Sequence, residues 1–447
     1  MEESPPFCYI LKMAKLSFFG AAQEVTGSCF LLASDSTKIL IDCGMFQGSR
    51  FNEKKTREPF PFDPASIDAL FLTHAHIDHS GRIPKLVKEG FRGKIYSSHA
   101  TRELAELMLK DSTGVLEKEA KRESEEILYT EADVDKAVSM WEGRDIHSEV
   151  SVGDFVVRFY DAGHILGSIM IAVDFGKERI VFTGDLGNAD TILQKTAEMI
   201  KAPTYFVMES TYGDRNHENE QRSLMLERVI EQTVKRGGTL MIPAFALERT
   251  QELLSVISKM MDELQIPKIP VYLDSPLSIK ATAIYEKYLK IPFFKFPNIN
   301  FSLTTEESKK INDVTPPKII IAGSGMSTGG RILHHERRYL PDKNSTLLLV
   351  SYQAPGSLGR RIQDGAGSVG LFGEDVPVRC HIEMISGYSA HADQETLFEF
   401  ARAHSDTLKK VFLVHGEPKA SLTLVQRLRD YLGVNASAPK YGDLIEL

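Results

Sequence analysis

Three imidazoles and one carboxylate lie within six residues of this chain, at His74, His76, Asp78 and His79. They follow the apolar run 69–72, which predicts a buried strand that ends where the cluster begins. Side chains of an extended segment alternate in direction, so His74, His76 and Asp78 can point to one side. Such nitrogen and oxygen donors bind zinc, which lowers the pKa of a bound water to about 7. The cluster therefore predicts a metal-dependent hydrolase.

Three further donors follow strand-like runs elsewhere in the chain: His164, Asp185 and His415. One tetrahedral ion cannot take all of these donors, whereas a carboxylate can bridge two ions about 3.5–4 Å apart. We therefore expect two zinc ions bridged by Asp185. The expected ligands of the first ion are His74, His76 and His164, and those of the second are Asp78, His79 and His415.

Asp42 also follows a strand-like run. We expect its carboxylate to orient a histidine ring of the site and the metal-bound water. An isolated aspartate at a strand end is usually a turn or helix cap, but the nearby donors favour the metal site for Asp42 and Asp185. A di-iron centre is an alternative, and the histidine content favours zinc.

Several elements must position these donors. Strand-like runs separated by turn residues predict consecutive strands of one sheet between residues 15 and 43. Helical periodicity is present at 101–121 and 131–140, and further strands are expected at 155–160 and 179–182. The candidate residues follow strands repeatedly, as expected for a site at one edge of a sheet.

After Tyr212 the pattern changes to strands that alternate with helices. The expected strands are 239–242, 271–273, 318–322 and 346–350, and the expected helices are 248–261 and 279–290. This alternation predicts a parallel, helix-flanked sheet. The last segment returns to polar clusters at strand ends. We therefore expect residues 209–382 to form a domain inserted between two parts of another domain, residues 13–208 and 383–447.

Composition narrows the class of protein. The 447 residues are 42% hydrophobic and 26% charged, which is typical of a globular protein of two or three domains. A net charge of −8 means that any nucleic-acid site must be a local basic groove. Four cysteines without short paired spacing and the lack of a long apolar run predict a cytoplasmic protein outside the membrane. We interpret residues 1–12 as an extension before Met13 without a structural role.

The segment 74–79, with His164 and Asp185 downstream, resembles the signature of the metallo-β-lactamase fold. Segments 209–213, 389–393 and 413–417 are similar to motifs of the β-CASP nucleases, and the resemblance extends from Lys15 to the end. It implies an α/β fold: a four-layer αβ/βα sandwich with metals at one edge, and an inserted parallel-sheet α/β domain that caps that edge. A histidine in the last motif, here His415, is typical of the RNA-processing branch, which includes the cleavage and polyadenylation endonuclease.

The resemblance also implies roles. His391 would be the general acid on the leaving oxygen, Glu209 would hold its ring, and Asp78 and Asp185 would serve both metal binding and catalysis. The substrate would be single-stranded RNA, cut internally to leave a 5′-phosphate, with 5′–3′ exonuclease activity left open. A homodimer is implied as well. From the residues alone, His391 could equally be an eighth ligand or a structural histidine.

A glycine-rich segment, 323–330, follows an expected strand, where backbone amides can cradle phosphate. A flexible turn is the alternative explanation. We expect RNA contacts from Ser324, Gly325, Met326, Ser327, Arg331 and Arg360. Arg249 either contacts RNA or anchors a helix, and the sequence does not decide between the two.

Three alternatives compete with a ribonuclease. A hydrolase of a small thioester or ester could use the same metal core, but it would need neither the inserted domain nor His391. A DNA nuclease of the same family is the second alternative, and His415 disfavours it. A non-catalytic RNA-binding subunit is the third, and the complete donor set makes it the weakest.

Overall fold

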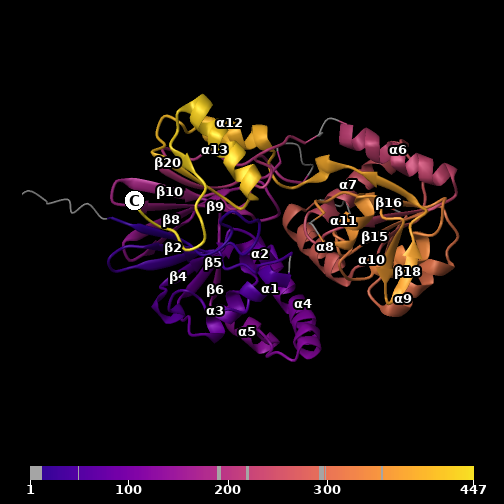
Figure 1. Ribbon diagram of the computed structural model, residues 1–447, viewed down its shortest axis with the longest axis horizontal. Coiled ribbons are helices and arrows are strands. Elements are labelled where there is room, and N and C mark those ends of the chain that lie inside the picture. Colours follow the sequence, from indigo (N-terminus) through magenta and orange to yellow (C-terminus); the bar gives the residue numbers. More distant parts are fainter. Residues whose placement is uncertain are drawn as a thin grey trace, which may run out of the picture.

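The computed structural model describes residues 13–447 except 49, 189–192, 218–220, 291–295, 297 and 354–355. The expected extension at residues 1–12 lies outside the described residues. Figure 1 shows two units side by side: a sandwich formed from both ends of the chain, and a second unit formed from its middle. The C-terminal end of the chain therefore returns to the N-terminal unit.

Two seven-stranded sheets form the sandwich. In spatial order, the first contains β22 (Leu444–Glu446), β1 (Lys15–Phe18), β2 (Phe30–Ala33), β3 (Lys38–Ile41), β4 (Ala69–Phe71), β5 (Lys94–Ser98) and β6 (Trp141–Arg144). The second contains β21 (Ala436–Ser437), β20 (Lys410–Val414), β11 (Tyr205–Glu209), β10 (Glu178–Phe182), β9 (Ile169–Phe175), β8 (Phe155–Asp161) and β7 (Glu149–Val152). The last strand, β22, pairs with the first, β1.

Helices cover both outer faces of the sandwich (Figure 1). The first sheet carries α3 (Ile83–Lys88), α4 (His99–Glu123) and α5 (Glu131–Ser139), and the second carries α12 (Gln394–Arg402) and α13 (Pro418–Leu432). Short helices α1 (Arg50–Lys55) and α2 (Ile77–Ser80) lie in the loops of the first sheet. One apolar cluster, which includes Phe71 and Phe159, fills the space between the sheets. This is the four-layer αβ/βα arrangement expected from the sequence.

The middle unit is built on a six-stranded sheet whose pairs are all parallel. Its order is β14 (Ile299–Phe301), β13 (Val271–Leu273), β15 (Lys318–Ala322), β12 (Thr239–Pro243), β16 (Thr346–Leu349) and β19 (His381–Met384). Its helices are α6 (Arg222–Lys235), α7 (Arg249–Asp262), α8 (Pro276–Leu289), α9 (Thr305–Lys310), α10 (Ile332–Tyr339) and α11 (Leu358–Gln363). A hairpin, β17 (Ser368–Leu371) and β18 (Glu374–Pro377), completes it.

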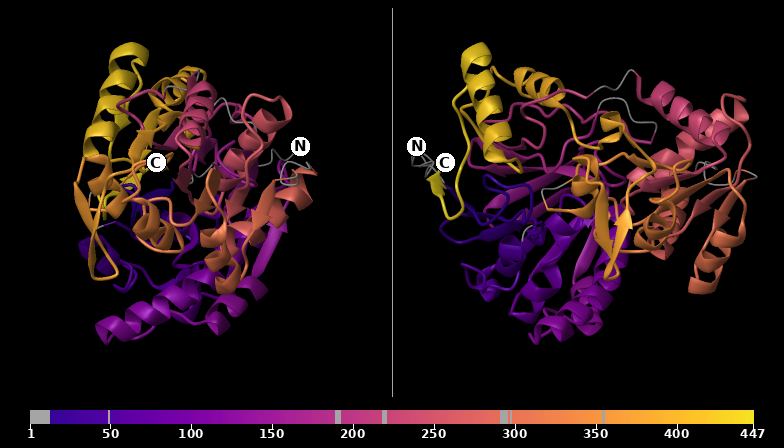
Figure 2. Two further views of the ribbon diagram at one scale, coloured as in Figure 1. Left: turned by 90° about the vertical axis from the view of Figure 1, so that its right-hand side faces the viewer. Right: turned by 45° about the vertical axis from the view of Figure 1, so that its right-hand side comes forward.

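The two units make direct contact. Helix α4 of the sandwich packs against α8 of the middle unit, and both panels of Figure 2 keep the units adjacent. Glu103 on α4 accepts hydrogen bonds from Lys287 and Tyr288 on α8, at 2.6 Å each to one oxygen. Among the described residues, no helix is long and apolar enough to cross a membrane.

Candidate metal centre and groove

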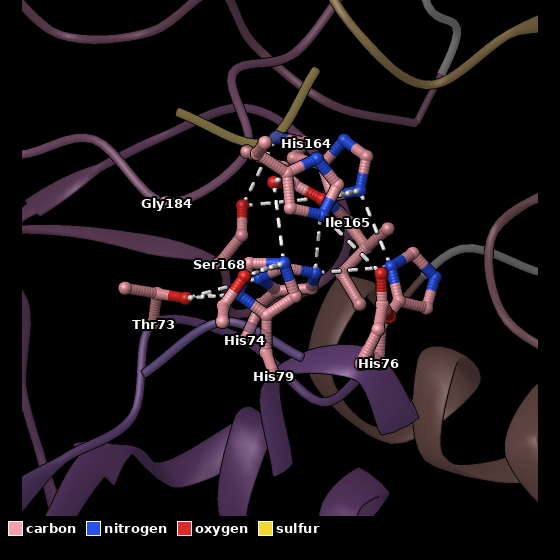
Figure 3. A network of polar contacts seen from close by, with 12 residues as sticks. Thr73, His74, His76, His79, His164, Ile165, Ser168 and Gly184 are labelled. Carbon is pink, nitrogen blue, oxygen red and sulfur yellow. Dashed lines mark hydrogen bonds and ion pairs between the residues drawn. The ribbon is translucent and has the colours of Figure 1, made fainter. Parts of the chain in front are cut away.

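The histidine-rich segment follows the buried strand β4 and enters α2 at His76. The rings of His74, His76, His79 and His164 turn toward one another in Figure 3. His164 comes from the loop after β8, where the hydroxyl of Ser168 accepts a hydrogen bond from its backbone N–H at 3.0 Å. Asp185 follows β10, and His415 follows β20. Residues far apart in the sequence therefore meet at one edge of the sandwich.

One group of donor atoms consists of His74, His76, His164 and Asp185. Nδ1 of His76 lies 3.0 Å from Nε2 of His74 and 3.3 Å from Nε2 of His164. Oδ2 of Asp185 lies 3.4 Å from Nε2 of His74. Ligands bound tetrahedrally at about 2.0–2.1 Å from one ion are separated by about 3.3 Å. These donors are therefore spaced as the ligands of one metal ion are.

A second group consists of Asp78, His79 and His415. Nε2 of His415 lies 3.3 Å from Oδ2 of Asp78, and Nε2 of His79 lies 3.3 Å from Oδ1 of Asp185. Asp185 thus presents one oxygen to each group. Its Oδ1 is buried and has no hydrogen-bond partner among the described residues. Its contacts with His79 and His415, at 3.3 and 3.7 Å, compensate this buried oxygen only weakly, and a cation at this position would lower the cost of its desolvation.

The protonation states suit metal binding. Burial and the neighbouring imidazoles lower the pKa values of His74 and His164 well below the usual range, and burial lowers that of His76 to about 4. These rings are therefore neutral near pH 7, as metal ligands must be. Burial lowers the pKa of His79, but Asp185 and Asp42 outweigh it and hold that pKa well above its usual value. A cation could take the place of this proton.

Asp42 lies behind the second group. Its Oδ2 lies 2.7 Å from Nδ1 of His79 and accepts a hydrogen bond from the hydroxyl of Thr73 at 2.9 Å, and its Oδ1 accepts the backbone N–H of Thr73 at 2.8 Å. With Nδ1–H of His79 donating to this carboxylate, Nε2 is the nitrogen that faces Asp185. The geometry is therefore suited to the orienting role expected of Asp42.

His391 and Glu209 lie beside the donor groups. Nδ1 of His391 is 3.3 Å from Oε1 of Glu209 and 3.8 Å from Oδ2 of Asp185. Glu209 ends strand β11, and its Oε1 also accepts the backbone N–H of Leu186 at 2.7 Å. Although burial lowers the pKa of His391, Glu209 and Asp185 raise it to about 9. Asp185, Glu209 and His391 are also close enough to form a third donor group, so the geometry alone leaves the eighth-ligand alternative open.

A groove of about 480 Å³ lies over these donors, and both units line it. His76, Asp78, His164, His391 and His415 belong to its wall on the sandwich side. The wall from the middle unit contains Phe245, Glu248, Arg249, Met326 and Tyr352. The donor groups therefore face a space in which a substrate could lie.

Most of the expected RNA contacts have other partners. Among the six, Met326 lines the groove. Ser327 is buried and donates to Glu336, and Gly325 packs against the ring of Phe245. Ser324 lies 3.1 Å from the hydroxyl of Thr328 on the exposed side of its loop.

The two arginines expected to bind RNA each pair with a carboxylate of the middle unit. Arg331 binds Asp274 at 2.8 Å and donates to the carbonyls of Ser302 and Leu303. Its guanidinium therefore stabilises the middle unit and does not line the groove. Arg360 pairs with Asp364 one helical turn away, at 2.9 Å, and also lies outside the groove wall.

Several groove residues were missed by the sequence argument: Phe245, Tyr352, Arg215 and Lys419. Phe245 and Tyr352 are exposed aromatic residues, at 39% and 38%. Each follows a strand of the parallel sheet, β12 or β16. That position at the carboxyl edge is the signal that could have identified them.

Comparison with protein families gives three matches along the chain. Residues 22–207 match the metallo-beta-lactamase superfamily, 250–362 match the Beta-Casp domain, and 375–439 match the Zn-dependent metallo-hydrolase RNA specificity domain. These matches follow the order of the sandwich, the middle unit and the returning C-terminal segment.

Similar proteins cover nearly all of the chain. Ribonuclease TTHA0252 of Thermus thermophilus is 35% identical over 95% of this chain and 98% of its own. Transcription termination factor FttA of Methanosarcina mazei is 33% identical over 95% of this chain and 70% of its own. A solved structure from Enterococcus faecalis V583, titled as a protein of unknown function, aligns over 97% of this chain with a TM-score of 0.58 and 14% identity, which shows a shared fold.

Proposed function

The chain belongs to the β-CASP ribonucleases of the metallo-β-lactamase superfamily, a group of metal-dependent hydrolases that act on RNA, and from this membership we propose that it uses two zinc ions to cut single-stranded RNA. We propose internal cleavage, with 5′–3′ exonucleolytic cleavage as a second mode. The observation that carries the proposal is the pair of donor groups that share Asp185 at the floor of the groove.

The assignment of ligands follows the two groups. His74, His76 and His164 would hold one ion, and Asp78, His79 and His415 would hold the other, with Asp185 between them. A bound pair of zinc ions supplies a water of lowered pKa and withdraws charge from the scissile phosphate. Nitrogen-rich donor sets of this kind are typical of zinc.

His391 would hold the proton that the leaving oxygen needs. Glu209, 3.3 Å from Nδ1, favours the protonated ring and fixes its direction, so the other ring nitrogen can face the substrate. His391 has 22% of its side chain exposed and lines the groove, so a strand there can reach it. If the 3′ oxygen is the leaving group that His391 protonates, the phosphate stays on the 5′ end of the downstream product.

A direct experiment separates this function from its alternatives. The zinc-loaded protein is incubated with end-labelled single-stranded RNA, with DNA of the same sequence, and with a generic thioester. We expect cleavage of RNA, abolished by a chelator and restored by zinc, and the product ladder separates internal from exonucleolytic cleavage. Hydrolysis of the thioester alone, or of DNA in preference to RNA, would overturn the proposal.

Two further proposals concern the cellular compartment and the oligomeric state of the enzyme. Within the described part of the chain, Cys29, Cys43 and Cys380 form no disulfide, which supports a reducing compartment such as the cytoplasm. We propose a homodimer from the family resemblance. Light scattering of the purified protein tests it, and a monomeric mass at assay concentrations would contradict it.

A further inference from the structure

The connection from β12 to α7 presents chemistry that the metal centre does not use. Phe245, Glu248 and Arg249 all line the groove, within five residues of one another. Strands β12 and β15 are neighbours in the sheet. After β12 the chain continues to β13, on the far side of β15, whereas after β15 it continues to β16, on the far side of β12. Open parallel sheets bind ligands at the carboxyl edge where the strand order reverses in this way.

Arg249 has a donor that finds no partner in the described part of the chain. The residue is 6% exposed, and its Nη1 lies 3.3 Å from Oε2 of Glu252. Its buried Nε has no hydrogen-bond acceptor among the described residues. Because an arginine can bind a phosphate through two parallel N–H groups, an unpaired Nε beside a groove is suited to a phosphate oxygen.

The same place is the N-terminus of α7. This helix has 14 residues, and no side chain of the residues that the structure describes caps its first turn. Uncapped N–H groups and the helix dipole favour an anion there. The helix N-terminus and Arg249 therefore offer complementary groups to one phosphate.

Phe245 offers a fixed aromatic face. Its carbonyl accepts a hydrogen bond from the hydroxyl of Thr250 at 2.7 Å, and its ring packs so closely on Gly325 that a Cβ there would lie 2.8 Å from Cδ2. The residue is nevertheless 39% exposed, and it lines the groove. Exposed rings in such channels stack with bases in a sequence-tolerant way.

Glu248 is the one carboxyl group in this segment, and its charge would repel a phosphate. It is 1% exposed, and its Oε2 accepts a hydrogen bond from Tyr285 at 2.8 Å. Burial, with Glu252 nearby, raises its pKa to about 8, so the group is mostly protonated near pH 7. The segment is then effectively cationic through Arg249.

We infer that residues 245–249 form a nucleotide subsite, in which Arg249 and the first turn of α7 bind a phosphate of the RNA other than the scissile one, while Phe245 stacks on a base. This inference rests on the proposed ribonuclease function. The subsite would set the path of the strand across the groove and thereby its position over the metal centre.

The test compares a long and a minimal substrate. For each variant, kcat/KM is measured on a ten-nucleotide RNA and on bis(p-nitrophenyl) phosphate, a diester with a single phosphate and no adjoining nucleotide. We expect the ratio of the two values to fall about tenfold in Phe245→Ala and in Arg249→Gln. Phe372→Ala, which removes a ring that is 53% exposed outside the groove wall, is the matched control and should keep the wild-type ratio.

Salt dependence separates the phosphate contact from the stacking contact. RNA affinity is measured by fluorescence anisotropy in a His391→Ala background. Adding Arg249→Gln should reduce the slope of log Kd against log salt by about 0.7, whereas Phe245→Ala should weaken binding and keep the slope. The subsite would be overturned if the ratio of kcat/KM on RNA to kcat/KM on the small diester stayed at the wild-type value in both variants, or if it fell equally in Phe372→Ala. An unchanged salt slope in Arg249→Gln would overturn it as well. If the wild-type protein cleaves no RNA, the proposed function itself fails. Because Phe245 is exposed, its variant remains informative even if Arg249→Gln misfolds.

Discussion

Replacement of His391 by alanine separates proton transfer from metal binding. His391 lies 3.8 Å from Asp185, yet it belongs to neither of the two donor groups proposed to hold the ions. His391→Ala should therefore retain the full metal content of the wild-type protein. It should nevertheless lose most of its activity on RNA.

The expected loss follows from the leaving group. A ribose oxygen departs poorly without a proton, and a positioned general acid contributes about 10²–10⁴-fold. This corresponds to about 3–5 kcal/mol of barrier. A p-nitrophenolate leaves without a proton, so hydrolysis of bis(p-nitrophenyl) phosphate should fall less than about tenfold in the same variant.

The pH profile tests the link to Glu209. The acid must be protonated, so activity is lost as the pH rises through the pKa of His391, which Glu209 and Asp185 hold near 9. Metal ions bound to Asp185 would offset the charge of that carboxylate, so Glu209 would be the main cause of the raised pKa of His391. Glu209→Gln should therefore move the alkaline limb of kcat to lower pH.

The assay measures kcat for both substrates from pH 6 to 10, with zinc quantified by elemental analysis in each variant. Equal losses on RNA and on the small diester would refute the general-acid assignment. Loss of zinc in His391→Ala would show that His391 is a ligand instead. An unmoved alkaline limb in Glu209→Gln would refute the electrostatic argument.

Three further substitutions have defined outcomes. Asp42→Asn removes the acceptor that orients His79 and should weaken binding of one zinc by about 10–100-fold, measured by competition with a chromogenic chelator; unchanged affinity would contradict this role. Arg331→Ala removes one partner of the buried Asp274, which keeps His335 at 2.7 Å and Ser308 at 2.6 Å, so it should lower the free energy of unfolding by about 2 kcal/mol in denaturant titration. The salt slope of RNA binding should not change, and a reduced slope would show that Arg331 contacts RNA. The pKa of Glu248 is raised to about 8, so this group contributes fully to stability below the usual carboxyl pKa, and the contribution is lost as the pH rises through 8. The pH dependence of Tm should therefore flatten in Glu248→Gln. An unchanged pH dependence of Tm would contradict the raised pKa.

The sequence predicted the architecture well because strand and helix signals are local. The helix expected at 131–140 and the strand expected at 318–322 correspond to α5 and β15, and the alternation after Tyr212 correctly indicated a parallel sheet. Strand β9, Ile169–Phe175, was not predicted, although it pairs with β8 and β10. Its inner residues are almost all buried, so it lacks the polar alternation that marks a half-exposed strand.

The donor groups were predictable because polar residues recur after apolar strands, and the ends of neighbouring strands meet at one edge. The groove contacts were not predictable in the same way. An arginine such as Arg331 attracts phosphate and carboxylate equally, and the partner that it binds, Asp274, is 57 positions away in the chain. Exposure of Phe245 depends on how the two units pack, and no local pattern encodes this.

Anomalous diffraction at the zinc edge, from crystals of the zinc-loaded protein, tests the two-ion centre most directly. We expect two peaks about 3.5–4 Å apart on either side of Asp185, one beside His74, His76 and His164 and the other beside Asp78, His79 and His415. A single peak, or a peak held by Glu209 and His391, would contradict this expectation.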